Sequence, residues 1–165
     1  MERRQMIISN TTPLINFSAI CRLDILEKLF GKICIPSAVE KELFVKGENY
    51  PNISELRKAN FIETLEAGNI LFCNALKRDL DDGEAEAIAL ALEKNGQLLL
   101  MDEISGREIA ESYSLRFTGT IGCIVEAKKI GIIASVKPLL DEIRIKARFW
   151  INPKLYERIL EENQG

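Results

Sequence analysis

The chain has 165 residues, a length typical of one domain, and we expect a single domain over residues 1–165. Hydrophobic residues make up 47% of it and charged residues 28%, which excludes a disordered or fibrous chain. The net charge of -3 excludes a protein that coats nucleic acid through a uniformly basic surface, although a local basic groove remains compatible with it.

Short β-type runs alternate along the chain with longer helical patterns. Strands are expected at residues 5–9, 32–35, 97–101 and 115–118. Helices are expected at residues 12–29, 36–45, 50–58, 70–77, 103–114, 121–130, 138–146 and 153–162. A further Ala-rich helix follows Gly83 and ends at Asn95-Gly96. The segment between residues 47 and 80 is less regular, and the helices at residues 50–58 and 70–77 are the elements expected in it. This alternation predicts an α/β fold with a central parallel sheet and helices on its faces.

The N-terminal segment and the apolar runs bear on localisation. Only Met6-Ile7-Ile8 follows Arg3 and Arg4 before polar residues return, which is too short for the apolar region of a signal peptide. No run reaches the roughly 18 apolar residues of a membrane span. We therefore expect a cytoplasmic protein with no membrane partner.

The absence of histidine restricts the chemistry that the chain can perform. It excludes Ser-His-Asp and Cys-His nucleophiles and histidine-ligated metals. Cys21, Cys34, Cys73 and Cys123 are widely spaced with no C-x-x-C pair, so we expect buried free thiols rather than zinc ligands or disulfides. A catalyst of this composition would use carboxylates and other oxygen ligands.

Four polar residues lie at the carboxyl ends of the expected strands or in the first turns of adjoining helices: Asn10, Glu42, Glu84 and Asp102. Ligands of open α/β sheets bind in that crevice. Carboxylates brought together there repel each other unless a cation lies among them. Oxygen ligands without His or Cys favour Mg²⁺ or Mn²⁺.

Each of these residues also has a purely structural explanation. Asn10 suits a turn, and Glu42 suits a solvated helix face. Glu84 follows Asp81 at the spacing of a capping box, and Asp102 can cap the next helix. Taken singly, structure explains each residue better than chemistry does, whereas their combination favours a site.

Five motifs, in order and spacing, resemble those of PIN-domain (PilT N-terminus) nucleases, and in particular a prokaryotic branch close to toxin-type ribonucleases. The motifs are "IISNTTPLI", "IPSAVEKEL", "LDDGEAEAIALA", "LLLMDE" and "TGTIG". The resemblance extends from about Met6 to Leu160. It implies a three-layer α/β/α sandwich with a central parallel sheet, and an acidic pocket that binds divalent metal and cleaves RNA.

The resemblance also implies roles for individual residues. The family's four acidic positions fall on Asn10, Glu42, Glu84 and Asp102, which would be the ligands of Mg²⁺ or Mn²⁺. Glu42, Glu84 and Asp102 would be catalytic. Thr120 falls where the family places a Ser or Thr near the pocket, which implies substrate binding; alternatively it caps the helix near residue 121.

The pocket leaves more than one function open. Asn10 stands where the family's well-studied nucleases carry Asp, so three carboxylates remain where their pattern has four. The protein would then be a metal-dependent ribonuclease, such as the toxin of a toxin-antitoxin pair, or a catalytically inactive RNA-binding or regulatory domain, or an interaction module. Glu86 could replace Glu84 in the pocket, but a helix turns about 200° over two residues, so only one can face it, and we expect Glu84.

Several partners follow from these features. The resemblance implies RNA as substrate and an antitoxin protein as partner. The apolar segment "GIIASVKPLL" and the C-terminal helix predict a homodimer, unless they complete the core of the monomer. The basic segment "RIKARFW" would suit RNA, but a solvated helix end explains it as well, and we assign it no site role.

Overall fold

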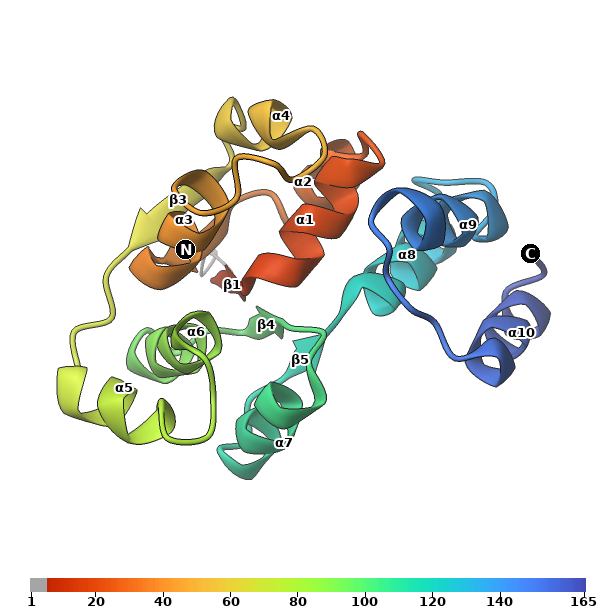
Figure 1. The fold of residues 1–165 in the computed structure, drawn as a ribbon. Coiled ribbons are helices and arrows are strands. Elements are labelled where there is room, and N and C mark those ends of the chain that lie inside the picture. The colour runs from red at the N-terminus through yellow and green to blue at the C-terminus, as the bar shows by residue number, and fades with distance from the viewer. Residues whose placement is uncertain (1–5) are drawn as a thin grey trace, which may run out of the picture.

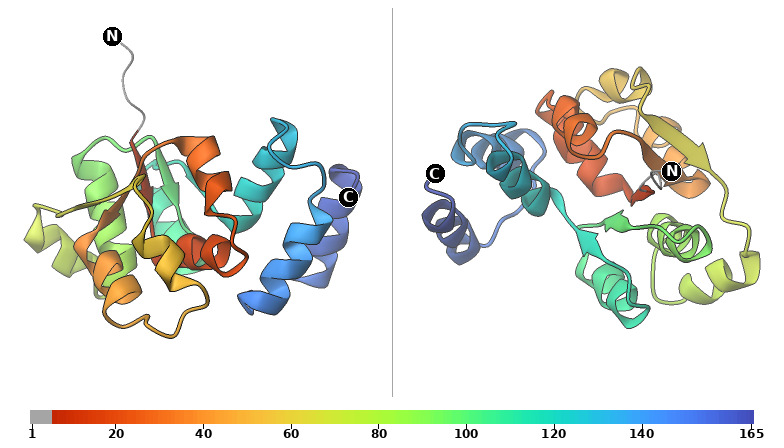
Figure 2. Two further views of the ribbon diagram at one scale, coloured as in Figure 1. Left: turned by 90° about the horizontal axis from the view of Figure 1, so that it is seen from above. Right: turned by 180° about the vertical axis from the view of Figure 1, so that it is seen from behind.

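The computed structural model describes residues 6–165, which form one parallel sheet covered by helices on both faces (Figures 1 and 2). The strand order is β3-β2-β1-β4-β5, and each neighbouring pair is parallel. The strands are β1 Ile7–Ser9, β2 Ile33–Pro36, β3 Ile62–Leu65, β4 Leu98–Leu100 and β5 Phe117–Thr118. The helices are α1 Thr11–Ala19, α2 Leu23–Phe30, α3 Ser37–Phe44, α4 Ile53–Arg57, α5 Ile70–Leu76, α6 Asp82–Glu93, α7 Ile104–Ser112, α8 Thr120–Lys129, α9 Lys137–Lys146 and α10 Pro153–Glu162. The expected three-layer α/β/α architecture with a central parallel sheet is confirmed.

Two hydrophobic cores lie on opposite faces of the sheet, because successive strand residues point to alternate faces. Ile7 and Leu100 face a core that includes residues of α1, α2, α3, α8, α9 and α10. Ile8 and Leu99 face a second core built with α5, α6 and α7. Helices α5, α6 and α7 accordingly lie on the other side of the sheet from α1 and α2 (Figure 1). Strands β1 and β4 are buried on both faces, as their continuous apolar runs predict.

The helix expected over residues 12–29 is in fact two helices, α1 and α2, and that expectation was wrong. Cys21 lies between them with φ 55°, a left-handed conformation that no helix continues through. The side-chain amide of Asn52 donates to the carbonyl oxygen of Ala19 at 3.0 Å, which satisfies a carbonyl at the end of α1. Cys21 is exposed, against expectation, whereas Cys34, Cys73 and Cys123 are buried free thiols as expected.

Strand β3 was not expected from the sequence. It pairs with β2, with Ile62 opposite Ile33, and forms one edge of the sheet. Its side chains are half-buried or exposed, and Glu63 pairs with Lys32 at the strand's surface. Short edge strands with charged residues lack the continuous apolar run of a buried strand, which explains why this one escaped notice.

The C-terminal helices contribute to the core of the monomer. Leu140 and Ile143 of α9 and Ile159 of α10 are buried within this chain. The apolar residues that predicted a homodimer therefore already have partners, and the dimer stays a prediction. None of the helices formed by residues 6–165 combines the length and apolar character needed to cross a bilayer.

Candidate functional site

The candidate site lies where the chain changes direction across the sheet. From β1 the chain adds β2 and then β3 on one side, and it returns to place β4 on the other side of β1. The carboxyl ends of β1 and β4 thus lie at a topological switch point, the usual ligand crevice of an open α/β sheet. Asn10 directly follows β1, and its backbone N–H donates to the carbonyl oxygen of Leu100 at 2.9 Å.

The side chain of Asn10 is 2% exposed and contacts two other elements. Its Nδ2 donates to Oε2 of Glu103 at 3.1 Å. Its Oδ1 faces Gly83 in the first turn of α6, where a Cβ would lie 3.0 Å from this oxygen and 3.5 Å from Oε2 of Glu42. The glycine therefore lets the helix approach both oxygens closely.

Glu42 lies on α3 and faces the start of α1. Thr11 donates its hydroxyl to Oε2 of Glu42 at 2.8 Å. Glu42 is half-buried, whereas Glu40 on the same helix is exposed and accepts a hydrogen bond from Thr64. Glu42 thus belongs to the site and is not a solvated helix residue.

Glu84 fills a structural role and lies at the site as well. It forms a capping box with Asp81: the backbone N–H of Glu84 donates to Oδ1 of Asp81 at 2.8 Å, and the backbone N–H of Asp81 donates to Oε2 of Glu84 at 3.3 Å. Burial, followed by the charges of Asp81, Glu103 and Glu42, raises the pKa of Glu84 to about 7. Those charges are close enough to disfavour its ionised form.

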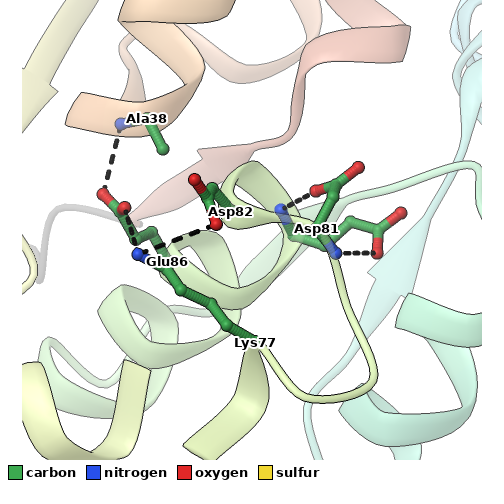
Figure 3. Close-up of polar contacts among 6 residues, drawn as sticks. Ala38, Lys77, Asp81, Asp82 and Glu86 are labelled. Carbon is green, nitrogen blue, oxygen red and sulfur yellow. Dashed lines mark hydrogen bonds and ion pairs between the residues drawn. The ribbon is translucent and has the colours of Figure 1, made fainter. Parts of the chain in front are cut away.

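Glu86 points away from these residues. It accepts hydrogen bonds from the backbone N–H of Ala38 and from Nζ of Lys77, each at 3.2 Å (Figure 3). Nζ of Lys77 also lies 3.9 Å from Oδ1 of Asp82. A dashed line marks this ion pair in Figure 3. Glu84 and Glu86 thus lie on different sides of α6, and Glu84 is the one that lies near the charges of Glu103 and Glu42.

Asp102 follows β4 and binds the first residue of α8. The backbone N–H and the hydroxyl of Thr120 donate to Oδ1 and Oδ2 of Asp102 at 2.8 and 2.7 Å. Asn16 of α1 in turn donates to the Thr120 hydroxyl at 2.9 Å. Burial raises the pKa of Asp102, and the charge of Glu103 adds to this, while the hydrogen bonds from Thr120 oppose it.

These contacts correct two structural expectations. Asp102 does not cap α7, whose N-cap residue is Glu103; it binds the start of α8 instead. Thr120 does not cap α8 either, because Gly119 is the N-cap residue and Thr120 is the first helical residue. The buried Thr120 hydroxyl is engaged by Asp102 and Asn16, so substrate binding by this side chain stays a prediction that these contacts do not support.

Glu103 was missed from the sequence, although it lies between the expected residues. It accepts hydrogen bonds from Asn10 and from the hydroxyl of Thr12. Its charge raises the pKa of both Glu84 and Asp102. The signal in the sequence is the acidic pair Asp102-Glu103 just after β4, because either carboxylate of such a pair can face the crevice.

The residues present fit a hard divalent cation in the kind of atom they offer. Carboxylate oxygens of Glu42, Glu84, Asp102 and Glu103 and the amide oxygen of Asn10 are donors that Mg²⁺ or Mn²⁺ prefers. In the conformation described for residues 6–165, no three Asp, Glu or Cys side chains come close enough to hold an ion. Each carboxylate instead accepts a hydrogen bond from a hydroxyl, amide or backbone N–H group.

The fold and this acidic switch point define an α/β protein with an acidic crevice at the carboxyl ends of its parallel strands. A sequence profile described as a PIN domain matches residues 6–164. The chain therefore belongs to the PIN-domain family. A search for relatives among curated proteins finds none that matches.

Proposed function

We propose that the protein is a ribonuclease that hydrolyses phosphodiester bonds of RNA with the help of Mg²⁺ or Mn²⁺. The observation that carries this proposal is that Glu42 and Glu103 lie beside Asn10 and that Glu84 lies near both glutamates. Burial first, and then the charges of Asp81, Glu103 and Glu42, raise the pKa of Glu84 to about 7. An acidic cluster that lowers stability in this way is explained by a cation that offsets its charge. Membership of the PIN-domain family over residues 6–164 supports the same function.

The chain's own residues would divide the work between them. The cation would be held by oxygen atoms of four residues: Asn10, Glu42, Glu84 and Asp102. Glu103 accepts a hydrogen bond from Asn10 and would offer a further carboxylate next to the cation. A bound cation supplies an activated water and offsets charge on the scissile phosphate. The hydroxyl of Thr11 orients the carboxylate of Glu42 toward the site, while Thr120 does the same for Asp102.

The decisive experiment is an RNA cleavage assay on protein stripped of metal with EDTA and then titrated with Mg²⁺ or Mn²⁺. We expect cleavage that depends on the metal and is lost in Asp102→Asn, which keeps an acceptor oxygen for Thr120 but removes the charge. Cleavage that persists in EDTA, or that Asp102→Asn leaves unchanged, would overturn the proposal.

A second candidate is a PIN-like RNA-binding or regulatory domain without activity. The bond between Asn10 and Glu103 favours it, because the amide satisfies a site carboxylate without any cation. RNA binding without cleavage in the same titration would support this candidate.

Two partners are proposed: an antitoxin protein, which the resemblance to toxin-type ribonucleases implies, and a second copy of the chain, which the apolar C-terminal segments predict. The mass in solution, measured by light scattering, tests the homodimer, and a monomer at all concentrations would contradict it. Co-purification with the product of the neighbouring gene tests the antitoxin, and its absence from the purified complex would contradict that partner.

A further inference from the structure

Arg107 brings a positive charge to the edge of the acidic site. It lies on α7, one turn after Glu103, and its Nε donates to the carbonyl oxygen of Met101 at 2.8 Å. Its guanidinium group also lies over the ring of Phe117, 5.4 Å from the centroid. These two contacts hold the guanidinium plane in place before any ligand binds.

Gly119 lies directly beside both Arg107 and Asp102. A Cβ at position 119 would be 2.1 Å from Nη2 of Arg107 and 2.4 Å from Oδ1 of Asp102. Any side chain here would displace one of these groups, so the glycine allows the guanidinium group to lie next to the acidic site. The charge of Arg107 opposes the rise in the pKa of Asp102, consistent with this proximity.

Arg107 lies near Asp102 but, among the described residues, its guanidinium group donates no hydrogen bond to a carboxylate. Both oxygens of Asp102 accept hydrogen bonds from Thr120. Among the residues that the structure describes, Arg107 forms no ion pair, whereas Arg22 and Arg144 do. A guanidinium group has five N–H donors, and the bond from Nε to Met101 uses one of them.

We propose that Arg107 binds a backbone phosphate of RNA next to the acidic site, an inference that rests on the proposed ribonuclease function. Carboxylates repel a polyanion, so a substrate phosphate needs a fixed cation beside them. A planar guanidinium group matches the geometry of a phosphate and donates two parallel hydrogen bonds to it. Arg107 is held with its Nη2 beside Asp102, which would place the bound phosphate against the proposed metal ligands.

The test compares three variants. Arg107→Gln removes the charge, and Arg107→Lys keeps the charge but loses the planar fork. Arg116→Gln is the matched control, because this exposed arginine immediately precedes β5, at the opposite end of that strand from Gly119. Binding of a fluorescent single-stranded RNA is measured by anisotropy over a series of KCl concentrations, in EDTA and in Mn²⁺, with cleavage and thermal melts recorded for each variant.

We expect Arg107→Gln to weaken RNA binding about tenfold, which corresponds to about 1.4 kcal/mol, because the variant loses a charge-assisted contact to phosphate. The slope of log affinity against log salt should fall by about 0.7, the value for one phosphate contact on a single strand. Arg107→Lys should keep the slope with intermediate affinity, and Arg116→Gln should match the wild type. A purely structural role would lower the melting temperature without moving the slope.

Binding and cleavage are measured separately, so the phosphate contact and the ribonuclease activity can each fail without the other. An unchanged slope in Arg107→Gln overturns the phosphate contact, whether or not the variant is less stable, even if the wild type cleaves RNA. The expected change in slope with no cleavage in any metal supports the contact and contradicts the ribonuclease. A wild type that neither binds nor cleaves RNA overturns both.

Discussion

Asn10 donates its side-chain amide to Glu103 at 3.1 Å, and this bond joins the end of β1 to the start of α7. An aspartate at position 10, as in the well-studied nucleases that the sequence resembles, could not make it, because both partners would then be carboxylates. The amide therefore suits a site that is stable without a cation, whereas a carboxylate would suit a site that always holds one.

Asn10→Asp should consequently have opposite effects with and without metal. In EDTA we expect a loss of about 1–3 kcal/mol, because the hydrogen bond to Glu103 is replaced by repulsion between buried charges. Excess Mn²⁺ should raise the melting temperature more in the variant than in the wild type, because an added ligand charge strengthens binding at oxygen sites. Thermal melts in both conditions measure this.

The control is Asn163→Asp, which makes the same chemical change at the far end of the chain, where Asn163 donates to the carbonyl oxygen of Ile159. It should show no greater response to Mn²⁺ than the wild type. Equal Mn²⁺ shifts in Asn10→Asp and the wild type would remove position 10 from the metal site and leave it as a turn residue.

The raised pKa of Glu84 predicts a specific dependence of stability on pH. Burial and the neighbouring carboxylates raise the pKa of Glu84 in the folded protein from an ordinary value of 4.5 to about 7. Between these values the folded state binds more protons than the unfolded state, so this group lowers the free energy of unfolding as the pH rises from about 4.5 to 7. A shift of this size corresponds to at most about 3 kcal/mol.

In EDTA, Glu84→Gln should reduce the fall in the free energy of unfolding between about pH 4.5 and 7. Glutamine preserves the capping box with Asp81, so the variant removes the charge and keeps the helix start. We expect it to be more stable than the wild type at pH 8 and similar to it near pH 4.5, as measured by urea unfolding across this range. If the two curves stay parallel, the pKa of Glu84 is not raised in the folded protein.

The two glutamates of α6 should respond differently to substitution. Glu86→Gln keeps an acceptor for the backbone N–H of Ala38 but loses the ion pair with Lys77, whose side chain is 30% exposed (Figure 3). We expect a cost below about 1 kcal/mol, as for most partly exposed pairs. The Mn²⁺-induced rise in melting temperature should be unchanged in Glu86→Gln and reduced in Glu84→Gln. The reverse pattern would mean that the metal ligand is Glu86.

The sequence predicts the fold well where local pattern and burial agree. Strands β1 and β4 are apolar runs buried on both faces, so composition alone locates them. Strand β3 is half-buried or exposed at the sheet edge, and the end of α1 before Cys21 is accompanied by a hydrogen bond from the distant Asn52 to Ala19, so neither has a strong local signal.

Some residues of the candidate site can likewise be placed from the sequence, whereas others depend on how a helix packs. Asn10 directly follows β1 and Asp102 lies two residues beyond the end of β4, so topology alone brings them to one edge of the sheet. The roles of Glu103 and Arg107 depend on the rotation of α7 about its axis, which packing with Phe117 and Met101 fixes. Periodicity within the segment does not reveal that rotation.

The hydroxyl of Thr120 should contribute to the free energy of unfolding and also hold the carboxylate of Asp102 in place. Thr120→Val preserves the shape of the side chain but removes a hydroxyl that donates to Asp102 and accepts from Asn16. Both partners would lose a buried hydrogen bond, and such losses cost about 1–3 kcal/mol. Thr120→Ser keeps the hydroxyl, so it should be more stable than Thr120→Val, as measured by chemical denaturation. It should also retain more RNA cleavage activity than Thr120→Val. Because Thr120 is buried, we expect cleavage to fall in Thr120→Val through misplacement of Asp102, with substrate affinity unchanged. Weaker substrate binding in both variants, with normal stability, would instead show that Thr120 contacts the substrate directly.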